Sequence, residues 1–295
     1  MNTSIPTNQT GILSNKPEQV VKANAYQIIT DRICGMLEQG TAPWSKPWKV
    51  SRGMPRNLIS QKCYRGINTW ILHSASYESP FWVTFKQASD AGARIKRGEK
   101  SMPVVFWKQV EVADKQTGDL VKIPFLRYYN VWNVSQLEGL KGTPAVEPTP
   151  TTPAARIYQD MLNKPALRHG MAAAFYDPAQ DSIGMPDLAR FATEADYYGT
   201  LYHELTHSTG HKSRLDRLTP TTFGSEDYSK EELVAEMGSA FLCGVAGIER
   251  QLEHSASYIA GWLKALKADP KLVVNAAACA QKAADYILGT TKPTE

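Results

Sequence analysis

One short motif constrains the fold of this chain more than any other feature. Residues 198–215 read YGTLYHELTHSTGHKSRL, in which His203, Glu204 and His207 form the pattern H-E-x-x-H. Residues four apart on an α-helix lie about 40° apart around the axis and roughly 6 Å apart along it, so both imidazoles can face one ion. The fold must therefore place a helix at this segment, beside a second element that completes a metal site.

The residue types in this motif predict its chemistry. Neutral imidazole nitrogens are zinc ligands, and a glutamate beside them can take a proton from water that the metal activates. The plain alternative is an exposed helix that carries two histidines by chance, but the motif falls within a predicted helix at 194–209, where the chemistry requires one. We expect His203 and His207 to bind Zn²⁺, or another divalent transition metal such as Mn²⁺, with Glu204 as the catalytic base.

The third protein ligand is expected from a later helix. The pattern H-E-x-x-H-x-x-G-x-x-H fails here, because its last position is Ser213 and His211 comes two residues too early. The predicted helix 229–247, SKEELVAEMGSAFLCGVAG, has Glu232 and Glu236 on one face among apolar neighbours, where a carboxylate needs a cation or donors. We expect Glu232 as the ligand and Glu236 as the acid that orients a histidine, although helix register alone leaves the reverse order open.

Four other polar residues near this site have weaker assignments. Glu231 is expected to be solvated at the start of its helix. His211, just past the motif, is expected at the surface or beside the ligands rather than among them. Tyr228 and His254 are alternative donors to a transition-state oxyanion, and the sequence does not choose between them.

Charge and tryptophan divide the chain into two modules. Residues 1–140 contain 18 Lys+Arg against 10 Asp+Glu, a net charge of +8, whereas the remainder has a net charge of −4, and six of the seven tryptophans lie in the first part. The stretch 141–155, KGTPAVEPTPTTPAA, contains four prolines, which favour an extended linker. We expect a disordered leader at 1–20, a nucleic-acid-binding domain at 21–140, a linker at 141–155 and a metal-binding domain at 156–290.

Periodicity predicts an α+β first domain and a mostly helical second domain. In the first, we expect helices at 24–40 and 63–76, a strand at 79–85, a short helix followed by a basic turn at 86–100, and a hairpin of strands at 102–112 and 120–134. In the second, we expect paired strands at 172–177 and 182–187, and helices near 154–163, 194–209, 229–247, 256–269 and 271–288.

Basic residues alternate with aromatic rings in the first module. Cations can follow a phosphate backbone, and rings can stack on bases, which is what a binder of single strands needs. We expect Trp44 and Trp48 to be exposed in their Pro-rich basic loop, and Trp70 and Trp82 to lie in the core; the plain alternative is that all of them are core and the charges are merely solvated. The expected DNA contacts are Trp44, Lys46, Trp48, Lys49, Arg52, Arg56, Lys62, Tyr64, Arg65, Arg94, Lys96, Arg97 and Lys100.

Composition also bears on the compartment. The four cysteines are scattered and form no C-x-x-C pair, which is typical of a reducing cytoplasm. No apolar run approaches the ~20 residues of a membrane-spanning helix, and the N-terminus lacks the basic start and apolar core of a secretory signal. We expect a cytoplasmic protein without a membrane partner.

Several blocks resemble one known family. LEQGTAPWSKPW, PRNLISQKCYRGINTWIL and SPFWVTFKQASDAGARIKRGEKSMPVVFWK resemble the N-terminal domain of ArdC-type antirestriction proteins of conjugative plasmids, a domain shared with TraC-type primases. HELTHSTGHKSRLDR and YSKEELVAEMGSAFLC resemble the polyvalent zincin-like metallopeptidase domain that accompanies it. No primase catalytic module is visible beside them.

This resemblance implies a domain that binds single-stranded DNA, joined to a metallopeptidase-like domain, and a role in establishing incoming plasmid DNA against restriction. It also implies a bacterial cytoplasm, with transfer to the recipient alongside the plasmid strand as an option, and a host protein as a candidate peptidase substrate. Two rival functions stay open: a protein that coats DNA and uses the zincin domain only as a scaffold, and a decoy that binds restriction enzymes directly.

Overall fold

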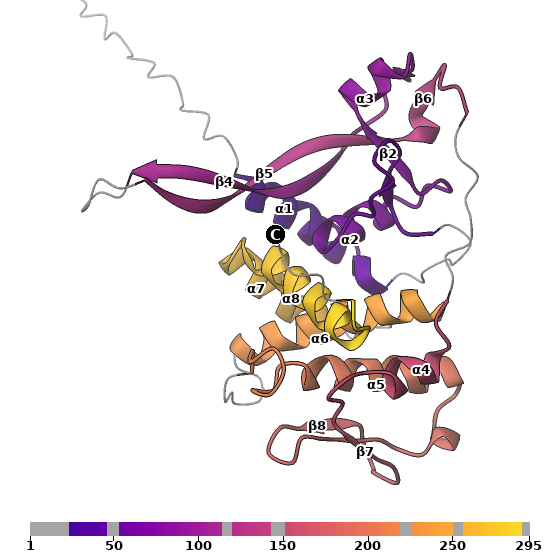
Figure 1. Ribbon diagram of the computed structural model, residues 1–295, viewed down its shortest axis with the longest axis vertical. Coiled ribbons are helices and arrows are strands. Elements are labelled where there is room, and N and C mark those ends of the chain that lie inside the picture. Colours follow the sequence, from indigo (N-terminus) through magenta and orange to yellow (C-terminus); the bar gives the residue numbers. More distant parts are fainter. Residues whose placement is uncertain are drawn as a thin grey trace, which may run out of the picture.

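The computed structural model describes residues 24–45, 53–113, 120–142, 151–218, 226–249 and 256–290 (Figure 1). The helices of the first module are α1 (Ala25–Glu38), α2 (Ile67–Ser74) and α3 (Phe85–Asp90), and its strands are β1 (Arg56–Asn57), β2 (Phe81–Thr84), β3 (Arg94–Ile95), β4 (Met102–Ala113), β5 (Leu120–Asn133) and β6 (Leu137–Glu138). The second module has strands β7 (Ala166–Arg168), β8 (Phe175–Asp177) and β9 (Ser182–Gly184), and helices α4 (Ala154–Gln159), α5 (Glu194–Ser208), α6 (Glu226–Ala246), α7 (Ala256–Ala268) and α8 (Leu272–Ile287). The expected α+β class with two modules is confirmed.

A four-stranded sheet organises the first module, with strand order β1-β2-β5-β4. Strands β4 and β5 form a long antiparallel ribbon, paired from Met102↔Val131 to Ala113↔Leu120. Helices α1 and α2 lie between this sheet and the helices of the second module (Figure 1). The sequence predicts this ribbon and both helices, but not the two-residue strands β1, β3 and β6.

Local sequence signals explain where the helices of this module begin and end. The side chain of Asn24 accepts a hydrogen bond from the backbone N–H of Gln27 at the start of α1, and Gly40 follows its end with φ of 74°, a conformation that favours glycine. Thr84 and Gln87 form a reciprocal capping box at the start of α3, which turns the chain sharply after β2.

The second module packs helices over a small mixed sheet of order β7-β9-β8. The predicted pairing of the two short strands is confirmed, because β8 runs antiparallel to β9 with Phe175 opposite Gly184. Strand β7, which the sequence does not predict, lies parallel to β9 on its other side. Strand β8 is thus an edge of this sheet, and it also contacts α5.

The two modules share one hydrophobic core. Trp44 packs edge to face against Trp262 of α7, with ring centroids 5.4 Å apart, and Trp70 of α2 lies 4.5 Å from the ring of Phe241 in α6. All four rings belong to one buried cluster that extends from α1 to α8. The contact between the modules is therefore an interior, not a loose junction of two surfaces. Residues 143–150, at the centre of the predicted linker, lie outside the described residues, so its boundaries at 140 and 156 stay predictions.

Burial corrects one expectation about the tryptophans. Trp70 and Trp82 are buried as predicted, with exposed fractions of 0% and 1%. Trp44, expected in an exposed loop, is only 2% exposed, because its segment packs against α1, α2 and α6 and its ring contacts Trp262 of α7. Within the described ranges, no helix combines the length and apolar character that crossing a bilayer requires.

Candidate metal centre

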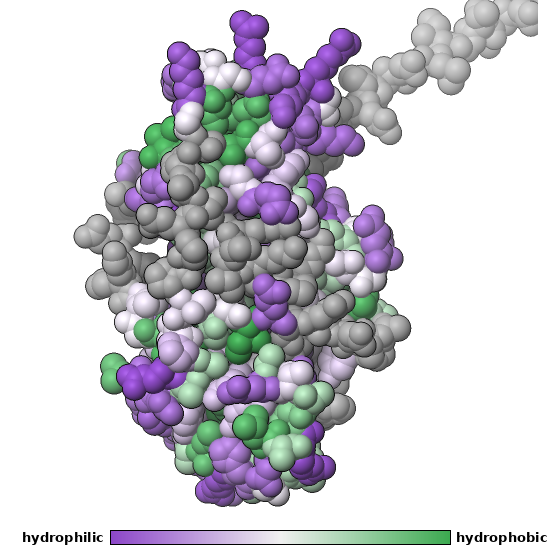
Figure 2. All heavy atoms as spheres, turned by 90° about the vertical axis from the view of Figure 1, so that its right-hand side faces the viewer, coloured by the Kyte–Doolittle hydropathy of each residue, from purple (hydrophilic) through white to green (hydrophobic). Residues whose placement is uncertain are grey.

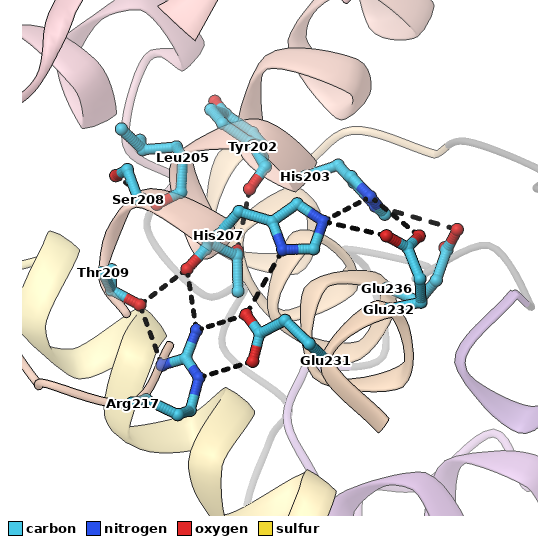
Figure 3. A network of polar contacts seen from close by, with 11 residues as sticks. Tyr202, His203, Leu205, His207, Ser208, Thr209, Arg217, Glu231, Glu232 and Glu236 are labelled. Carbon is cyan, nitrogen blue, oxygen red and sulfur yellow. Dashed lines mark hydrogen bonds and ion pairs between the residues drawn. The ribbon is translucent and has the colours of Figure 1, made fainter. Parts of the chain in front are cut away.

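Helix α5 presents the H-E-x-x-H motif on one face. The helix begins at Thr193, whose side chain accepts a hydrogen bond from the backbone N–H of Asp196, and the motif falls in its last two turns. The Nε2 atoms of His203 and His207 lie 3.1 Å apart, so the two imidazoles converge as their spacing predicts (Figure 3).

Helix α6 crosses α5 closely enough to deliver a third donor. A Cβ at Gly238 would lie 2.4 Å from Cγ2 of Thr206, and Ser239 donates a hydrogen bond of 2.7 Å to the carbonyl of Gly199. Because position 238 has no side chain, the helix backbones can approach closely at that point. The approach sets the carboxylate of Glu232 beside both histidines.

Three donor atoms meet with the spacing of a metal site. Oε2 of Glu232 lies 3.5 Å from Nε2 of His203, and Oε1 of the same carboxylate lies 3.4 Å from Nε2 of His207. Ligands held about 2.0–2.1 Å from a tetrahedral ion are separated by roughly 3.3 Å, so these distances of 3.1 to 3.5 Å fit a divalent transition metal. These three residues form the candidate ligand group among the described residues, with donors within 4.8 Å of one another.

Carboxylates also face the far nitrogens of both imidazoles. Glu236 lies 3.7 Å from Nδ1 of His203, and Glu231 lies 3.2 Å from Nδ1 of His207 (Figure 3). An acid at Nδ1 orients the ring and directs Nε2 at the ion. The structure therefore places Glu236 where the sequence predicts an orienting acid, and adds Glu231 as a second one.

Glu231 corrects the expectation of a solvated residue at the helix start. Its side chain is 16% exposed, and both of its oxygens accept hydrogen bonds of 2.8 Å from Arg217. The same guanidinium donates to the carbonyl of Thr206 and the hydroxyl of Thr209, each at 3.1 Å. Arg217 thus ties the loop after α5 to α6, and no periodicity or spacing in the sequence indicates it.

Charge around the ligands is tightly coupled. Burial lowers the pKa of His207, but hydrogen bonds to Glu231 and Glu232 outweigh it and raise the pKa to about 10. Burial raises the pKa of the Glu232 carboxyl, but hydrogen bonds from His203 and His207 outweigh it and hold the pKa well below its usual range. Because a metal needs the neutral imidazole, the ion and a proton compete for the same nitrogen.

Glu204 has the properties of a proton-transfer group. It is 9% exposed, and burial raises the pKa of its carboxyl above the ordinary value. Nearby His203 and His207 oppose this shift, as does a hydrogen bond that the carboxylate accepts from the backbone of Tyr176 in β8. A raised pKa brings a carboxyl closer to neutral pH, where it can both accept and return a proton.

The site opens into a cleft of about 1020 Å³ between β8, α5, α6 and α8. Of the two alternative oxyanion donors, Tyr228 lines this cleft and His254 lies outside the described residues. Burial and the neighbouring Glu232 raise the pKa of the Tyr228 hydroxyl, which keeps it a hydrogen-bond donor at neutral pH. Tyr258 of α7 also lines the cleft, and the sequence does not indicate it.

His211 lies in the turn after α5 rather than with the three ligands. Its Nδ1 is 2.8 Å from the hydroxyl of Ser213. The neighbouring Arg214 fixes this turn by pairing both of its terminal nitrogens with Asp181, at 2.8 and 2.9 Å. The polar role of this segment is therefore to hold the end of the motif helix.

The structure places the predicted DNA contacts in different environments. Trp44 and Tyr64 are buried, at 2% and 9% exposure, so the expected exposure of Trp44 is wrong and neither ring is open to a base. Arg56 is half-buried, while Arg65 is exposed and forms an ion pair with Asp285 of α8. Lys46, Trp48, Lys49 and Arg52 lie outside the described residues.

The remaining cations are exposed. One of them, Arg94, lies in β3, and three more follow this strand within five residues. Hydrophilic side chains project from the end of the molecule that carries α3 and β6 (Figure 2). This end retains the basic character that the sequence predicts. The exposed cations are Lys62, Arg94, Lys96, Arg97 and Lys100.

Comparisons with known proteins match both modules. Residues 23–132 match the N-terminal domain of the anti-restriction factor ArdC, and residues 159–279 match a zincin-like metallopeptidase domain. The metal-free crystal structure of the antirestriction protein ArdC from plasmid R388 is 39% identical, with a TM-score of 0.75 over 90% of this chain and 97% of that one. Its Mn(II)-bound structure gives a TM-score of 0.74 at 36% identity, over 92% of this chain and 99% of that one.

A longer relative contains the same pair of modules. A DNA primase TraC of Escherichia coli is 38% identical over 91% of this chain, but this chain spans only 27% of that primase. With both modules matched and nearly all of the solved ArdC structure covered, the chain belongs to the ArdC antirestriction family, in which an ArdC-type N-terminal domain is joined to a zincin-like metallopeptidase domain.

Proposed function

We propose that this protein is a plasmid antirestriction factor that binds single-stranded DNA without sequence specificity and carries a metal-dependent peptidase site. One observation carries the proposal: Glu204, His203, His207 and Glu232 meet in a cleft in a chain of the ArdC family. We assign zinc as the resident ion and manganese as its alternative, since the donor set of two imidazoles and one carboxylate suits zinc and a relative has been solved with Mn(II).

The residues of the site have distinct roles. His203, His207 and Glu232 would hold the ion, which supplies Lewis-acid chemistry: it polarises a carbonyl and acidifies water. Glu204 accepts a proton from the attacking water and returns it to the leaving amine, in keeping with its raised pKa. Tyr228 donates a hydrogen bond to the oxyanion from the wall of the cleft.

The DNA-binding part of the proposal has separate support. The first 140 residues have a net charge of +8, and the cations around β3 are exposed. A basic surface binds phosphates without reading sequence, which suits a protein that protects any incoming strand. We place this activity in the bacterial cytoplasm, either in the donor or in the recipient after transfer of the strand.

One comparison tests whether peptidase chemistry serves antirestriction. Glu204→Gln is nearly isosteric and removes only the proton acceptor, so it should retain metal and DNA affinity. Plasmid establishment would be compared in restricting and non-restricting recipients for the wild type, this variant and a control. The control is Glu194→Gln, which changes an exposed residue of the same helix. The proposal expects the plasmid with Glu204→Gln to establish less well than the wild type in the restricting recipient. In the non-restricting recipient the two should establish equally well.

Two rivals predict other outcomes of that experiment. If Glu204→Gln protects incoming DNA in full, the zincin domain is a scaffold and DNA coating carries the function. If protection survives but follows stoichiometric binding to a restriction enzyme, and not DNA affinity, the decoy model is correct. Absence of the ion from the wild type after growth in zinc would remove the metal site itself from the proposal.

A further inference from the structure

The β4–β5 ribbon exposes an unusual share of large apolar side chains. It extends well past α1 at one end of the molecule (Figure 1). Five large hydrophobic residues on it are 39% to 70% exposed, and clustered exposed rings mark a surface with a partner. They are Phe106, Trp107, Leu120, Phe125 and Tyr128.

Strand register sorts these rings between the two faces of the ribbon. Phe106 pairs with Arg127, and Lys108 pairs with Phe125, so the four side chains share one face. The Phe106 ring also lies 5.5 Å from the ring of Tyr129, and the Arg127 guanidinium lies 5.7 Å from the centre of the Phe125 ring. We call these five residues the ring–cation face.

The other face of the ribbon also exposes apolar side chains, namely Trp107, Tyr128 and Leu120, and it differs from the ring–cation face in charge. Its Trp107 is held edge to face by Tyr26 of α1, with centroids 6.2 Å apart, and Leu126 beside it is 6% exposed. Glu111 falls on this other face, because it is three residues from Lys108 on the same strand, and its register partner across the ribbon is Lys122. Between Val104↔Tyr129 and Lys108↔Phe125, the ring–cation face carries two cations and no acid.

Building on the proposed DNA-binding function, we propose that the ring–cation face is the docking surface for single-stranded nucleic acid. Phe106 and Phe125 are diagonal neighbours across the ribbon, roughly 7–8 Å apart, so each can stack on one base of a strand. Lys108 and Arg127 lie between the rings and neutralise phosphates. Stacking tolerates every base, which gives binding without sequence preference.

This assignment moves base stacking away from Trp44, which the core occupies. It also separates two functions of the basic module. The exposed cations around β3 can attract a strand at long range, whereas the ribbon supplies the short-range contacts that hold bases.

The test uses the full-length protein and a fluorescein-labelled oligothymidylate in anisotropy titrations. The double variant Phe106→Ala/Phe125→Ala should raise the Kd about tenfold or more, because it removes two stacking platforms. The double variant Lys108→Gln/Arg127→Gln should reduce the log–log salt slope by about 1.4, at roughly 0.7 for each phosphate that is no longer neutralised. Phe85→Ala is the matched control, an exposed phenylalanine (66%) on α3.

The results separate this inference from the function on which it rests. If the wild type fails to bind the oligonucleotide at any salt concentration, the DNA-binding function falls and the inference with it. If the wild type binds and both ribbon variants bind equally well, only the ring–cation face is wrong. If Phe85→Ala alone binds the oligonucleotide more weakly, the stacking site lies on α3. If a ribbon variant changes the sedimentation coefficient but not the DNA affinity, the ring–cation face binds a second copy of this chain instead.

Discussion

Arg217 donates two hydrogen bonds of 2.8 Å to the carboxylate of Glu231, one to each oxygen. The same carboxylate lies 3.2 Å from Nδ1 of His207, so a residue outside the ligand set controls how a ligand is presented. Planar guanidinium and carboxylate groups paired in this way fix orientation as well as charge. Glu231 and Arg217 thus belong to the metal centre even though neither would touch the ion.

Arg217→Met should weaken zinc binding about 10- to 100-fold, the usual cost of losing an orienting partner around a metal site. Without the guanidinium, Glu231 keeps its burial but loses two donors, and His207 loses its fixed orientation. Isothermal titration with zinc and with manganese would measure the change. The control Arg156→Met, which removes an exposed ion pair with Asp160, should leave the zinc affinity unchanged. If Arg217→Met also leaves the zinc affinity unchanged, Arg217 only anchors the loop.

Glu232→Gln should weaken the metal site more than Glu236→Gln, because one residue is a donor and the other orients His203 from 3.7 Å. We expect Glu232→Gln to purify without stoichiometric zinc, and Glu236→Gln to retain zinc with a Kd raised about 10- to 100-fold. Elemental analysis after dialysis would measure the zinc content of Glu232→Gln. Competition with a chelator would measure the Kd of Glu236→Gln for zinc. The reverse order would exchange the roles of the two acids.

Trp44→Ala should destabilise the whole protein rather than remove a DNA contact. The ring is 2% exposed and packs against Trp262 across the module interface, so its removal should cost about 3–5 kcal/mol of unfolding free energy. Urea unfolding followed by circular dichroism would measure this, with the exposed Phe85→Ala as the control near zero. A stable Trp44→Ala with reduced DNA affinity would restore the exposed-loop interpretation.

Asp181→Asn should cost about 1–3 kcal/mol at pH 7, because Arg214 is fully buried and would lose its charged partner. Asparagine tolerates the left-handed backbone at this position (φ 46°), so the change isolates the charge. Burial raises the pKa of Asp181, but hydrogen bonds from Arg214 and Tyr176 outweigh it and lower the pKa overall.

A lowered pKa in the folded state fixes the direction of the pH effect. The stability that Asp181 contributes is present above its unfolded pKa of about 3.9 and is lost as the pH falls through the lower folded value. Unfolding of the wild type and Asp181→Asn between pH 7 and pH 3 should therefore converge toward the acid end. If the unfolding free energies of the two proteins stay the same distance apart at every pH, the ion pair does not titrate in this range. The control Asp160→Asn, which removes an exposed ion pair, should differ little from the wild type in unfolding free energy at any pH.

A fragment that ends at residue 142 should fold poorly by itself, because it would expose Trp44, Trp70 and the inner face of α1. We expect increased binding of a hydrophobic dye and a broad thermal transition relative to the full chain. A sharp transition and low dye binding would show that the first module has an adequate core of its own. The result bears directly on whether DNA affinity can be studied in an isolated domain.

The sequence predicts what local spacing determines. The i, i+4 histidines and the run of apolar residues in α6 lie within single elements, so the motif helix, its neighbour and the histidine pair are predictable without the fold, whereas the choice between Glu232 and Glu236 depends on how the two helices pack. The ribbon is equally local, since its two strands follow one another along the chain and pair antiparallel over their whole length.

What the sequence does not predict depends on elements brought together from far apart. A Pro-rich basic loop is ordinarily solvated, and here the packing of its segment against α1, α2, α6 and Trp262 of α7 buries Trp44. Glu231 resembles a surface acid in the sequence because its partner Arg217 lies in the loop after another helix. Strands of two residues, such as β1 and β3, are too short to show any period at all.

The shared interior also bears on how such genes evolve. Helix α8 borders the metal cleft through Asn275 and Cys279, and it meets the other module where Gln281 accepts a hydrogen bond from Gly66. An exchange of either half for an unrelated one would leave Trp44 and Trp70 without the rings that they pack against. The Escherichia coli primase that aligns with 91% of this chain carries both modules together inside a much longer protein.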